Sequence, residues 1–433
     1  MKTVIEIMDM LKALVSDRAF MDRHKEGEQS FSRKKKLDFQ TVFFFVLSLV
    51  KLCLDFDSEN FFNTLGIDVW PSAVTQRRAQ INWTAFEEAL EKMAEAMPQS
   101  RTLNRYRILA VDGMHGGLPR RPELVEKYGL VGNAMYPQFH AVAVFDVLNE
   151  FFLCASWDKY PRDEREAIIN LIKTKKLPEK SVLLDDRGFP GMEVFKHLID
   201  STHKFVMRVS RSTFKEIAAF EASGKREDNV RIKYDKKRAK WNHHKSMSIE
   251  LPCMCTLRCV RVDLPSGETE ILVTNLSRTE FNADEIGKLY YLRWGIETSI
   301  NHLKNAIHIE TFVGVKDNSI QQEFFAGLIR YSLARLAVLE AQAEYERKKK
   351  RNLKLEYKIN FTKAAAVLAS KMAKIVKCIF HSLRAELEEV CSEVTARMVK
   401  YKTAIRRGRT YPQRKTSCRH PVQYRKVRAA LYV

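Results

Sequence analysis

Four reactive side chains recur at helical spacing between Tyr290 and Lys304. The segment reads YYLRWGIETSINHLK, with Arg293 and Glu297 at its fourth and eighth positions. At about 100° per residue, an α-helix would place Arg293, Glu297 and Lys304 roughly 60°, 20° and 40° from Tyr290, all on one face. Such a face suits a metal ion held by Glu297 beside a phosphodiester held by the two cations. A solvated, ion-paired helix face is the alternative that this spacing alone leaves open.

Two aspartates could complete a metal site of this kind. Asp112 ends the apolar run Ile-Leu-Ala-Val, and Asp186 follows the run Ser-Val-Leu-Leu-Asp; a glycine comes soon after each. If these runs are neighbouring strands, both carboxylates emerge at one edge of the sheet. With Glu297 they would then hold two Mg²⁺ or Mn²⁺ ions for an in-line phosphoryl transfer. Asp185 would replace Asp186 if the strand register were shifted by one residue.

Taken together, these residues resemble the DDE transposases of bacterial insertion sequences, specifically the IS-four group. The resemblance covers roughly residues 100–310 and is supported by the segments Asp-Arg-Gly-Phe at 186–189 and Asp-Gly at 112–113. It rests on the Y-R-E-K signature of that group, Tyr290-x2-Arg293-x3-Glu297-x6-Lys304. The resemblance implies an RNase H-like fold in which Asp112, Asp186 and Glu297 are the catalytic, metal-binding triad.

The resemblance also implies DNA contacts near the point of cleavage. Tyr290, Arg293 and Lys304 would hold the phosphates of the transposon end. Trp294 follows the arginine, as a tryptophan often does in this group, and could stack on a displaced base. For Trp294 alone, an indole packed in the core is the alternative interpretation.

The implied activity is that of a DNA transposase. Such an enzyme binds the terminal inverted repeats of its element, cleaves them with Mg²⁺, for which Mn²⁺ can substitute, and joins the 3′ ends to target DNA. Cut-and-paste movement, often through a hairpin at the transposon end, and a homodimer that pairs two ends are further implications. Two other classes stay open: an inactive or domesticated DNA-binding protein, and an RNase H-like nuclease without strand transfer.

Composition agrees with a nucleic-acid partner. The chain has 433 residues, 45% of them hydrophobic, and a formal net charge of +21. A field of this sign raises the local concentration of polyanions such as DNA. No apolar stretch reaches the roughly 20 residues that span a bilayer, and the N-terminus does not resemble a signal peptide. We therefore expect a cytoplasmic, nucleoid-associated protein without a membrane partner.

Hydrophobic periodicity predicts a mixed α/β fold. Strands are expected at Arg107–Val111, at 139–147 and 150–157, and at 181–184 and 204–209, with helices between them. A single helix beginning near Asn282 is expected to carry Tyr290 to Lys304, and Asn282 is a candidate N-cap. The fold class is thus an RNase H-like mixed-sheet catalytic core with a β-rich insertion, flanked by helical N- and C-terminal regions.

Five regions follow from these patterns. The insertion is expected to contain strands at 230–234, 247–251, 255–264 and 269–276. The predicted order is a helical DNA-binding region at 1–105, the first part of the core at 106–210, the insertion at 211–280, the second part of the core with the glutamate helix at 281–342, and a basic helical region and tail at 343–433.

A short basic segment near the N-terminus could read DNA. Residues 71–81 read PSAVTQRRAQI and follow the helical pattern at 61–65. In a helix-turn-helix such a segment lies in the major groove, where Gln76, Arg77 and Arg78 would contact bases or phosphates. An exposed basic helix without this role is the equal alternative.

The cysteines predict a reduced chain. The eight cysteines are scattered, which is typical of buried thiols and not of a disulfide framework. Cys253, Cys255 and Cys259, with His243 and His244, could bind zinc, but their spacing matches no ribbon or finger. Alternation of Cys255 and Cys259 on one face of a buried strand is the favoured interpretation.

Overall fold

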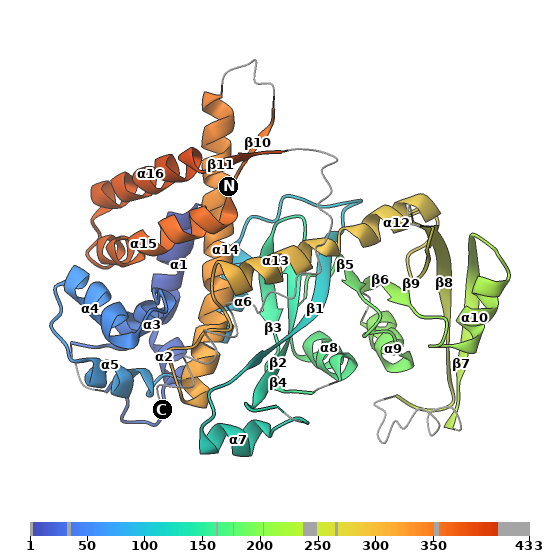
Figure 1. Cartoon of the computed structure of the whole chain (residues 1–433), viewed down its shortest axis with the longest axis horizontal. Coiled ribbons are helices and arrows are strands. Elements are labelled where there is room, and N and C mark those ends of the chain that lie inside the picture. Colours follow the sequence, from blue (N-terminus) through green and yellow to red (C-terminus); the bar gives the residue numbers. More distant parts are fainter. Residues whose placement is uncertain are drawn as a thin grey trace. The chain divides into compact units, whose positions relative to one another are not determined.

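The computed structural model of the chain contains two compact units, shown in Figure 1. It describes residues 3–32, 36–132, 134–161, 163–175, 177–201, 203–236, 249–264, 267–349 and 355–405. One unit is helical and comprises Met1–Pro98, Gly116–Gln138 and Asn301–Val433. The other comprises Gln99–His115 and Phe139–Ile300 and contains most of the sheet.

A nine-stranded sheet organises the second unit. Its strands run in the order β3-β2-β1-β5-β6-β9-β8-β7, and the short β4 pairs with β2 off this path. The strands are β1 (Arg107–Gly117), β2 (Gln138–Asp146), β3 (Phe151–Ala155), β4 (Asp158–Lys159), β5 (Ser181–Asp185), β6 (Lys204–Val209), β7 (Glu227–Tyr234), β8 (Cys253–Asp263) and β9 (Thr269–Thr274).

The centre of the sheet is parallel and its flanks are antiparallel. β1 pairs with β5 and β5 with β6 in parallel, whereas β2–β3, β6–β9, β8–β9 and β7–β8 are antiparallel. The central strand β5 is buried along its whole length because both of its faces are covered. This is the mixed α/β sheet that the sequence predicts, and the strands of the insertion extend the same sheet from β6.

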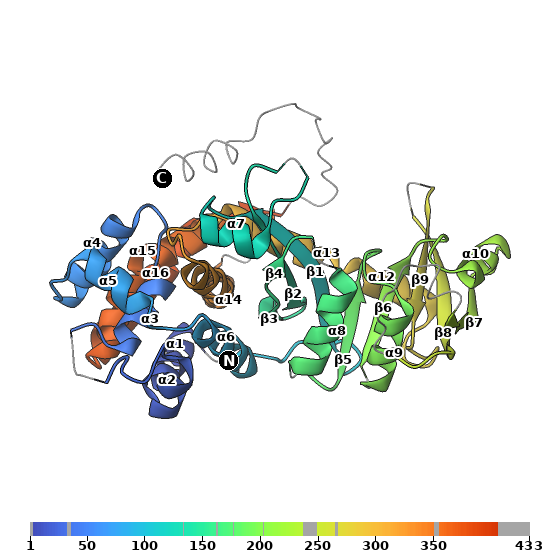
Figure 2. The same cartoon turned by 90° about the horizontal axis from the view of Figure 1, so that it is seen from below.

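Helices cover both sides of these strands. Figure 2 shows α8 and α9 on one side and α12 and α13 on the other. Their bounds, with that of the outlying α10, are α8 (Glu164–Thr174), α9 (Met192–Asp200), α10 (Lys215–Ala222), α12 (Ala283–Tyr291) and α13 (Trp294–Asn305). Asn282 caps α12 in a capping box with Glu285, as its predicted N-cap role requires.

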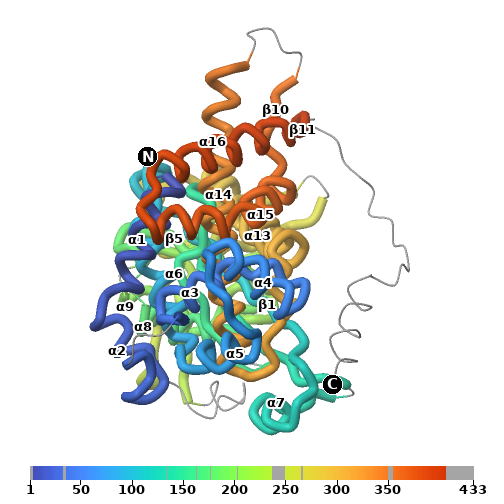
Figure 3. Tube along the Cα trace, turned by 90° about the vertical axis from the view of Figure 1, so that its left-hand side faces the viewer, coloured from blue at the N-terminus to red at the C-terminus, as the bar shows by residue number. Residues whose placement is uncertain are grey.

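The helical unit is built around one long buried helix, α14 (Asp317–Lys348). Residues on all sides of α14 are buried, because helices from both ends of the chain pack against it. The helices packed against α14 include α1, α3, α6, α15 and α16, all labelled in Figure 3. The unit contains α1 (Val4–Ser16), α2 (Arg18–His24), α3 (Phe39–Leu47), α4 (Leu54–Leu65), α5 (Pro71–Arg78), α6 (Thr84–Ala96), α7 (Pro122–Tyr128), α15 (Phe361–Phe380), α16 (Arg384–Lys400) and the hairpin β10 (Tyr357–Ile359) with β11 (Lys402–Ala404).

Candidate active site

The register of β1 against β5 brings the two predicted aspartates level with each other. The last paired residues are Ala110 and Leu184, and Asp112 and Asp186 each come two residues later. Because side chains alternate along a strand, Asp112 lies on the same face of β1 as Ala110, whereas Asp186 is the first residue after β5, which ends at Asp185. Asp112 was predicted to end its strand, but β1 continues to Gly117, beyond the end of its pairing with β5.

Two residues of the predicted signature, Tyr290 and Arg293, converge on Asp186. The Tyr290 hydroxyl donates to Asp186 Oδ1 at 3.2 Å. Arg293 Nη2 lies 3.9 Å from Asp186 Oδ2 and donates to Glu297 Oε1 at 2.8 Å. One guanidinium thus links two of the three predicted catalytic carboxylates.

The predicted single helix is divided into two, which is a correction. α12 ends at Tyr291 and α13 begins at Trp294. Between them the backbone N–H of Arg293 donates to the Tyr290 carbonyl at 2.9 Å, and that of Ile296 donates to the Arg293 carbonyl at 3.0 Å. These bonds to the third preceding residue tighten the chain, so angles calculated for one straight α-helix do not apply across the break.

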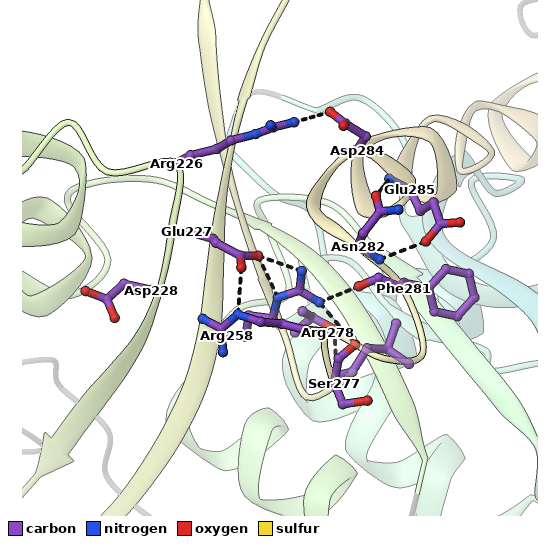
Figure 4. A network of polar contacts seen from close by, with 12 residues as sticks. Arg226, Glu227, Asp228, Arg258, Ser277, Arg278, Phe281, Asn282, Asp284 and Glu285 are labelled. Atoms are coloured by element: carbon purple, nitrogen blue, oxygen red, sulfur yellow. Dashed lines mark hydrogen bonds and ion pairs between the residues drawn. The ribbon is translucent and has the colours of Figure 1, made fainter.

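Polar contacts fix the start of α12 to the inserted strands (Figure 4). Arg258 on β8 donates from Nη2 to Glu227 Oε2 on β7 at 2.6 Å, and from Nη1 to the Phe281 carbonyl at 2.6 Å. Arg278 adds a second cation on Glu227 at 2.6 Å. Since Phe281 immediately precedes the Asn282 cap, the insertion anchors the helix that carries Tyr290.

Burial separates the two adjacent aspartates. The Asp185 side chain is fully buried, and within the described residues neither of its oxygens has a hydrogen-bond partner. This burial raises its pKa well above the usual value; the Arg293 charge opposes the shift and the Asp112 charge adds to it. The side chain of Asp186 is 35% exposed, which makes Asp186 the carboxylate that a cation can reach from solvent.

Asp112 titrates in an acidic environment. Burial raises its pKa to about 6, and the charges of Glu297 and Glu164 add to that shift. A hydrogen bond from the Gly113 N–H and the charge of Arg293 act in the opposite direction. The carboxylates here therefore outnumber the cations that face them.

The donor chemistry of this cluster fits a hard divalent cation. Mg²⁺ and Mn²⁺ prefer carboxylate oxygens, and an added cation would lower the mutual repulsion of these acids. In the described part of the chain, no three His, Cys, Asp or Glu side chains are already close enough to hold a metal ion. The Arg293 guanidinium instead bridges Asp186 and Glu297.

One acidic residue at this cluster was missed by the sequence interpretation. Glu164, in the first turn of α8, contributes to the raised pKa of Asp112. Its sequence context, Asp-Glu-Arg-Glu at 163–166, reads as a helix start and gave no other signal. Only the packing of α8 against β1 and the loop after β5 could identify it.

Trp294 and Lys304 have different environments. The Trp294 side chain is 50% exposed, so it is not the packed core indole considered as its alternative. Lys304 lies near the end of α13, in the segment assigned to the helical unit, and pairs with Glu310 at 2.9 Å.

The three residues on α5 that were predicted to contact DNA also differ in exposure and in their contacts. Gln76 is exposed, whereas Arg77 lies over the Phe31 ring at 4.2 Å and donates to the Leu37 carbonyl. Arg78 is 4% exposed and pairs with the fully buried Glu323 at 2.9 Å. Because removing a buried charge from its partner costs several kcal/mol, Arg78 is a core residue of the helical unit and not a DNA contact.

The cysteine cluster lies on β8. Cys255 and Cys259 are buried with Leu257 on one face, as the alternation predicts, and burial raises the pKa of each thiol to about 12. His243, His244 and the first two residues of the predicted strand at 247–251 lie outside the described residues, and the other three residues of that segment do not form a strand.

Comparison with known proteins identifies relatives of this arrangement. The family model of the transposase DDE domain matches residues 103–333. The chain is 24% identical over 285 residues to the transposase InsG of insertion sequence element IS4 from Escherichia coli K12, covering 63% of this chain and 62% of that protein. It is 24% identical over 167 residues to a probable transposase of element IS5377 from Geobacillus stearothermophilus, covering 36% and 39%.

These alignments span less than two thirds of each relative's length. Among solved structures, the piggyBac transposase synaptic complex with hairpin DNA aligns at a TM-score of 0.47 and 9% identity, covering 98% of this chain and 84% of that one. No helix in the described part of the chain is long and apolar enough to cross a membrane.

Proposed function

Because the chain belongs to the transposase DDE domain family, we propose that it binds the terminal inverted repeats of an insertion sequence, cleaves them by metal-dependent phosphoryl transfer and joins the 3′ ends to target DNA. The convergence of Tyr290 and Arg293 on Asp186, with Glu297 on the same guanidinium, carries this proposal. Asp112 on β1 stands level with Asp186, which directly follows the neighbouring strand β5.

Each residue of the cluster has a role in the proposed reaction. Asp112, Asp186 and Glu297 hold Mg²⁺, for which Mn²⁺ can substitute. Divalent ions held by these carboxylates would supply the Lewis acidity that an in-line phosphoryl transfer needs at its attacking and leaving oxygens. Tyr290 orients Asp186 through its hydroxyl, which donates to the carboxylate. Arg293, freed from Glu297, binds a non-bridging phosphate oxygen.

The DNA partners extend beyond these carboxylates. Lys304 binds a phosphate of the transposon end, and Trp294 stacks on a displaced base. Gln76 and Arg77 on α5 contact DNA as part of a helical DNA-binding region at 1–105. Arg78 makes no such contact because it is buried. The excess of cations in the whole chain favours binding to target DNA of any sequence and association with the nucleoid. A homodimer pairs two ends for cut-and-paste movement.

Cleavage and joining of defined DNA ends tests this proposal. The DNA flanking the encoding gene supplies candidate inverted repeats, and a duplex carrying them is incubated with the full chain and Mg²⁺ or Mn²⁺. The comparison variant is Glu297→Ala, and the control is Glu126→Gln, an exposed glutamate on α7. We expect all three proteins to bind the duplex and only Glu297→Ala to lose cleavage and joining.

Other outcomes assign the chain to another class. Binding without cleavage by the unchanged protein would identify a DNA-binding relic, and cleavage without joined products would identify a nuclease. Cleavage by Glu297→Ala would remove Glu297 from the active site.

A further inference from the structure

Two glycines beside the proposed metal residues leave a space that a carboxylate fills. Gly113 follows Asp112, and Gly188 comes two residues after Asp186. A Cβ atom on Gly113 would lie 2.2 Å from Glu164 Oε1, and a Cβ on Gly188 would lie 2.3 Å from Glu164 Oε2. The Glu164 carboxylate therefore lies between the β1 residue that follows Asp112 and the loop after β5 that begins with Asp186.

The start of α8 is held in this position by its own contacts. Asp163 caps the helix by accepting from the Arg165 N–H at 2.9 Å. The Arg165 side chain donates from Nε to the Gly188 carbonyl at 3.2 Å and lies against Gly191. Neighbours on both sides thus fix Glu164 against the loop after β5.

Glu164 has little compensation for its charge. Its ion-pair partner among the described residues is His140, whose Nε2 lies 3.7 Å from Oε1, beyond hydrogen-bond distance. The Glu164 side chain is 32% exposed, so an ion from solvent can reach it. Its charge also contributes to the raised pKa of Asp112. An acid held here would repel a phosphodiester unless a cation lay between them.

We propose that Glu164 is a fourth carboxylate of the metal site, binding a divalent cation together with Asp112. This inference rests on the proposed function, which supplies the cation and the other ligands. It gives a reason for glycine at both 113 and 188, because any larger residue would displace the carboxylate. If Glu164 served only to pair with His140, its carboxylate would not need to lie against both glycines.

Mn²⁺ binding and cleavage test the inference on the full chain with the repeat-ended duplex. The variants are Glu164→Gln, which keeps the shape, Glu164→Asp, which keeps the charge, and Glu166→Gln, an exposed control on the same helix. Free Mn²⁺ is counted by electron paramagnetic resonance, and thermal unfolding checks each fold. We expect Glu164→Gln to weaken Mn²⁺ binding about tenfold or more, and to raise the Mn²⁺ needed for half-maximal cleavage similarly. Glu164→Asp should retain more affinity, and Glu166→Gln should match the unchanged protein.

The variant Asp112→Asn distinguishes failure of the fourth-ligand inference from failure of the proposed function. If Asp112→Asn loses cleavage while Glu164→Gln keeps its Mn²⁺ affinity, the fourth ligand is overturned and the proposed function stands. If Asp112→Asn cleaves normally, the proposed function itself fails. If Glu166→Gln lost the same Mn²⁺ affinity, the loss would come from removing any negative surface charge on this helix, and the inference would also be overturned. A Glu164→Gln protein that melts earlier but binds Mn²⁺ normally would leave Glu164 a structural residue only.

Discussion

Trp294 is a half-exposed aromatic side chain beside buried ones. Tyr290 and Arg293 are 4% and 3% exposed, whereas half of the Trp294 surface is open to solvent. The Arg293 guanidinium lies 5.1 Å from the Trp294 ring and restricts its orientation. An oriented indole whose surface is not used in the core suits stacking on an unpaired base.

Replacing Trp294 should therefore weaken DNA binding and leave folding intact. Each stacked base contributes about 1–3 kcal/mol, so Trp294→Ala should bind a duplex with one unpaired terminal base about 5- to 100-fold more weakly. Trp294→Phe should retain most of the affinity. Fluorescence of 2-aminopurine at the unpaired position measures stacking directly. Tyr291→Ala, at a more exposed neighbour, is the control, and equal losses from both variants would argue against a specific role.

Lys51 belongs to a buried charge cluster in the helical unit. Its Nζ donates to the His308 carbonyl at 3.0 Å. The charges that act on it come from two cations, Arg78 and Arg330, and two acids, Asp57 and Glu323. With Lys51 charged, three cations would face two acids. Burial, with the two arginines, lowers the pKa of Lys51 to about 7.

This shift predicts a pH dependence of stability. Between pH 7 and about 10 the unfolded chain carries a proton on Lys51 that the folded chain does not, so stability should rise with pH in this window. Lys51→Met should flatten that rise and increase the free energy of unfolding at pH 7 by a few kcal/mol. Urea denaturation at pH 7 to 9.5 measures both effects. Lys92→Met, at an exposed lysine, should change neither, and an unchanged slope in Lys51→Met would contradict the assignment.

At the residue scale, candidate site residues could be predicted where they recur at a regular spacing or end an apolar run in the sequence. Asp112 and Asp186 were predicted from the ends of apolar runs, and the parallel register of β1 with β5 brings them level. Arg78 and Glu164 were not interpretable in this way. Arg78 pairs with Glu323, and Glu164 lies against Gly113 and Gly188. These partners are distant in sequence, and no local pattern indicates such contacts.

At the scale of elements, α13 depends on a close approach to the turn between β2 and β3. A Cβ atom on Gly295 would lie 2.8 Å from Val147 Cγ1. Val147 is held in turn by its N–H, which donates to the Ile108 carbonyl on β1 at 2.9 Å. Gly295 therefore sets the distance between the helix that carries Glu297 and the strand that carries Asp112.

A methyl group at 295 should disturb this distance. In an exposed helix Gly→Ala stabilises by about 1 kcal/mol, but here the stiff, β-branched Val147 has to move. Gly295→Ala should lower the cleavage rate about tenfold or more while DNA binding persists. Adding Val147→Ala should restore most of the rate because it removes the clash. Single-turnover cleavage measures both proteins, and failure of the double variant to recover would show that the clash is not the cause.

Elements of the fold were predicted better than their connections. Strand periodicity identified most of the inserted strands, yet it carries no information on which sheet a strand joins, and β9 pairs with β6 of the core. The break between α12 and α13 was missed because apolar spacing continues through Leu292 without a proline or glycine to mark it. Tight turns formed by ordinary residues leave little trace in sequence.

At the scale of the whole molecule, positive charge is concentrated near one end of the chain. The residues after Tyr401 include ten Lys or Arg and no Asp or Glu. Removing residues 406–433 takes away nine of these cations, since Lys402 remains, and lowers the formal charge from +21 to +12. Residues 406–433 lie outside the described part of the chain, so the prediction rests on charge alone.

Truncation after residue 405 should weaken binding to DNA of random sequence. Each lost phosphate contact should reduce the slope of log affinity against log salt by about 0.9. Fluorescence anisotropy at several salt concentrations gives the slope. A full-length variant with these nine residues changed to glutamine controls for chain length and should behave like the truncation. An unchanged slope in both would mean that the tail makes no DNA contact.

The mixed sheet also determines when during synthesis the protein can first act. Asp112 lies on β1 and Asp186 directly follows β5, two strands that pair early in the chain, but Glu297 comes 185 residues after Asp112, beyond all of the inserted strands. At about 5–20 residues per second, a ribosome needs about 10–40 s to cover that interval. During it, the growing chain has already exposed α5 and the other N-terminal helices, while α14, against which they pack, is still untranslated. Interrupted translation before Glu297 would thus release chains that cannot cut DNA and whose N-terminal helices have no partner to cover them.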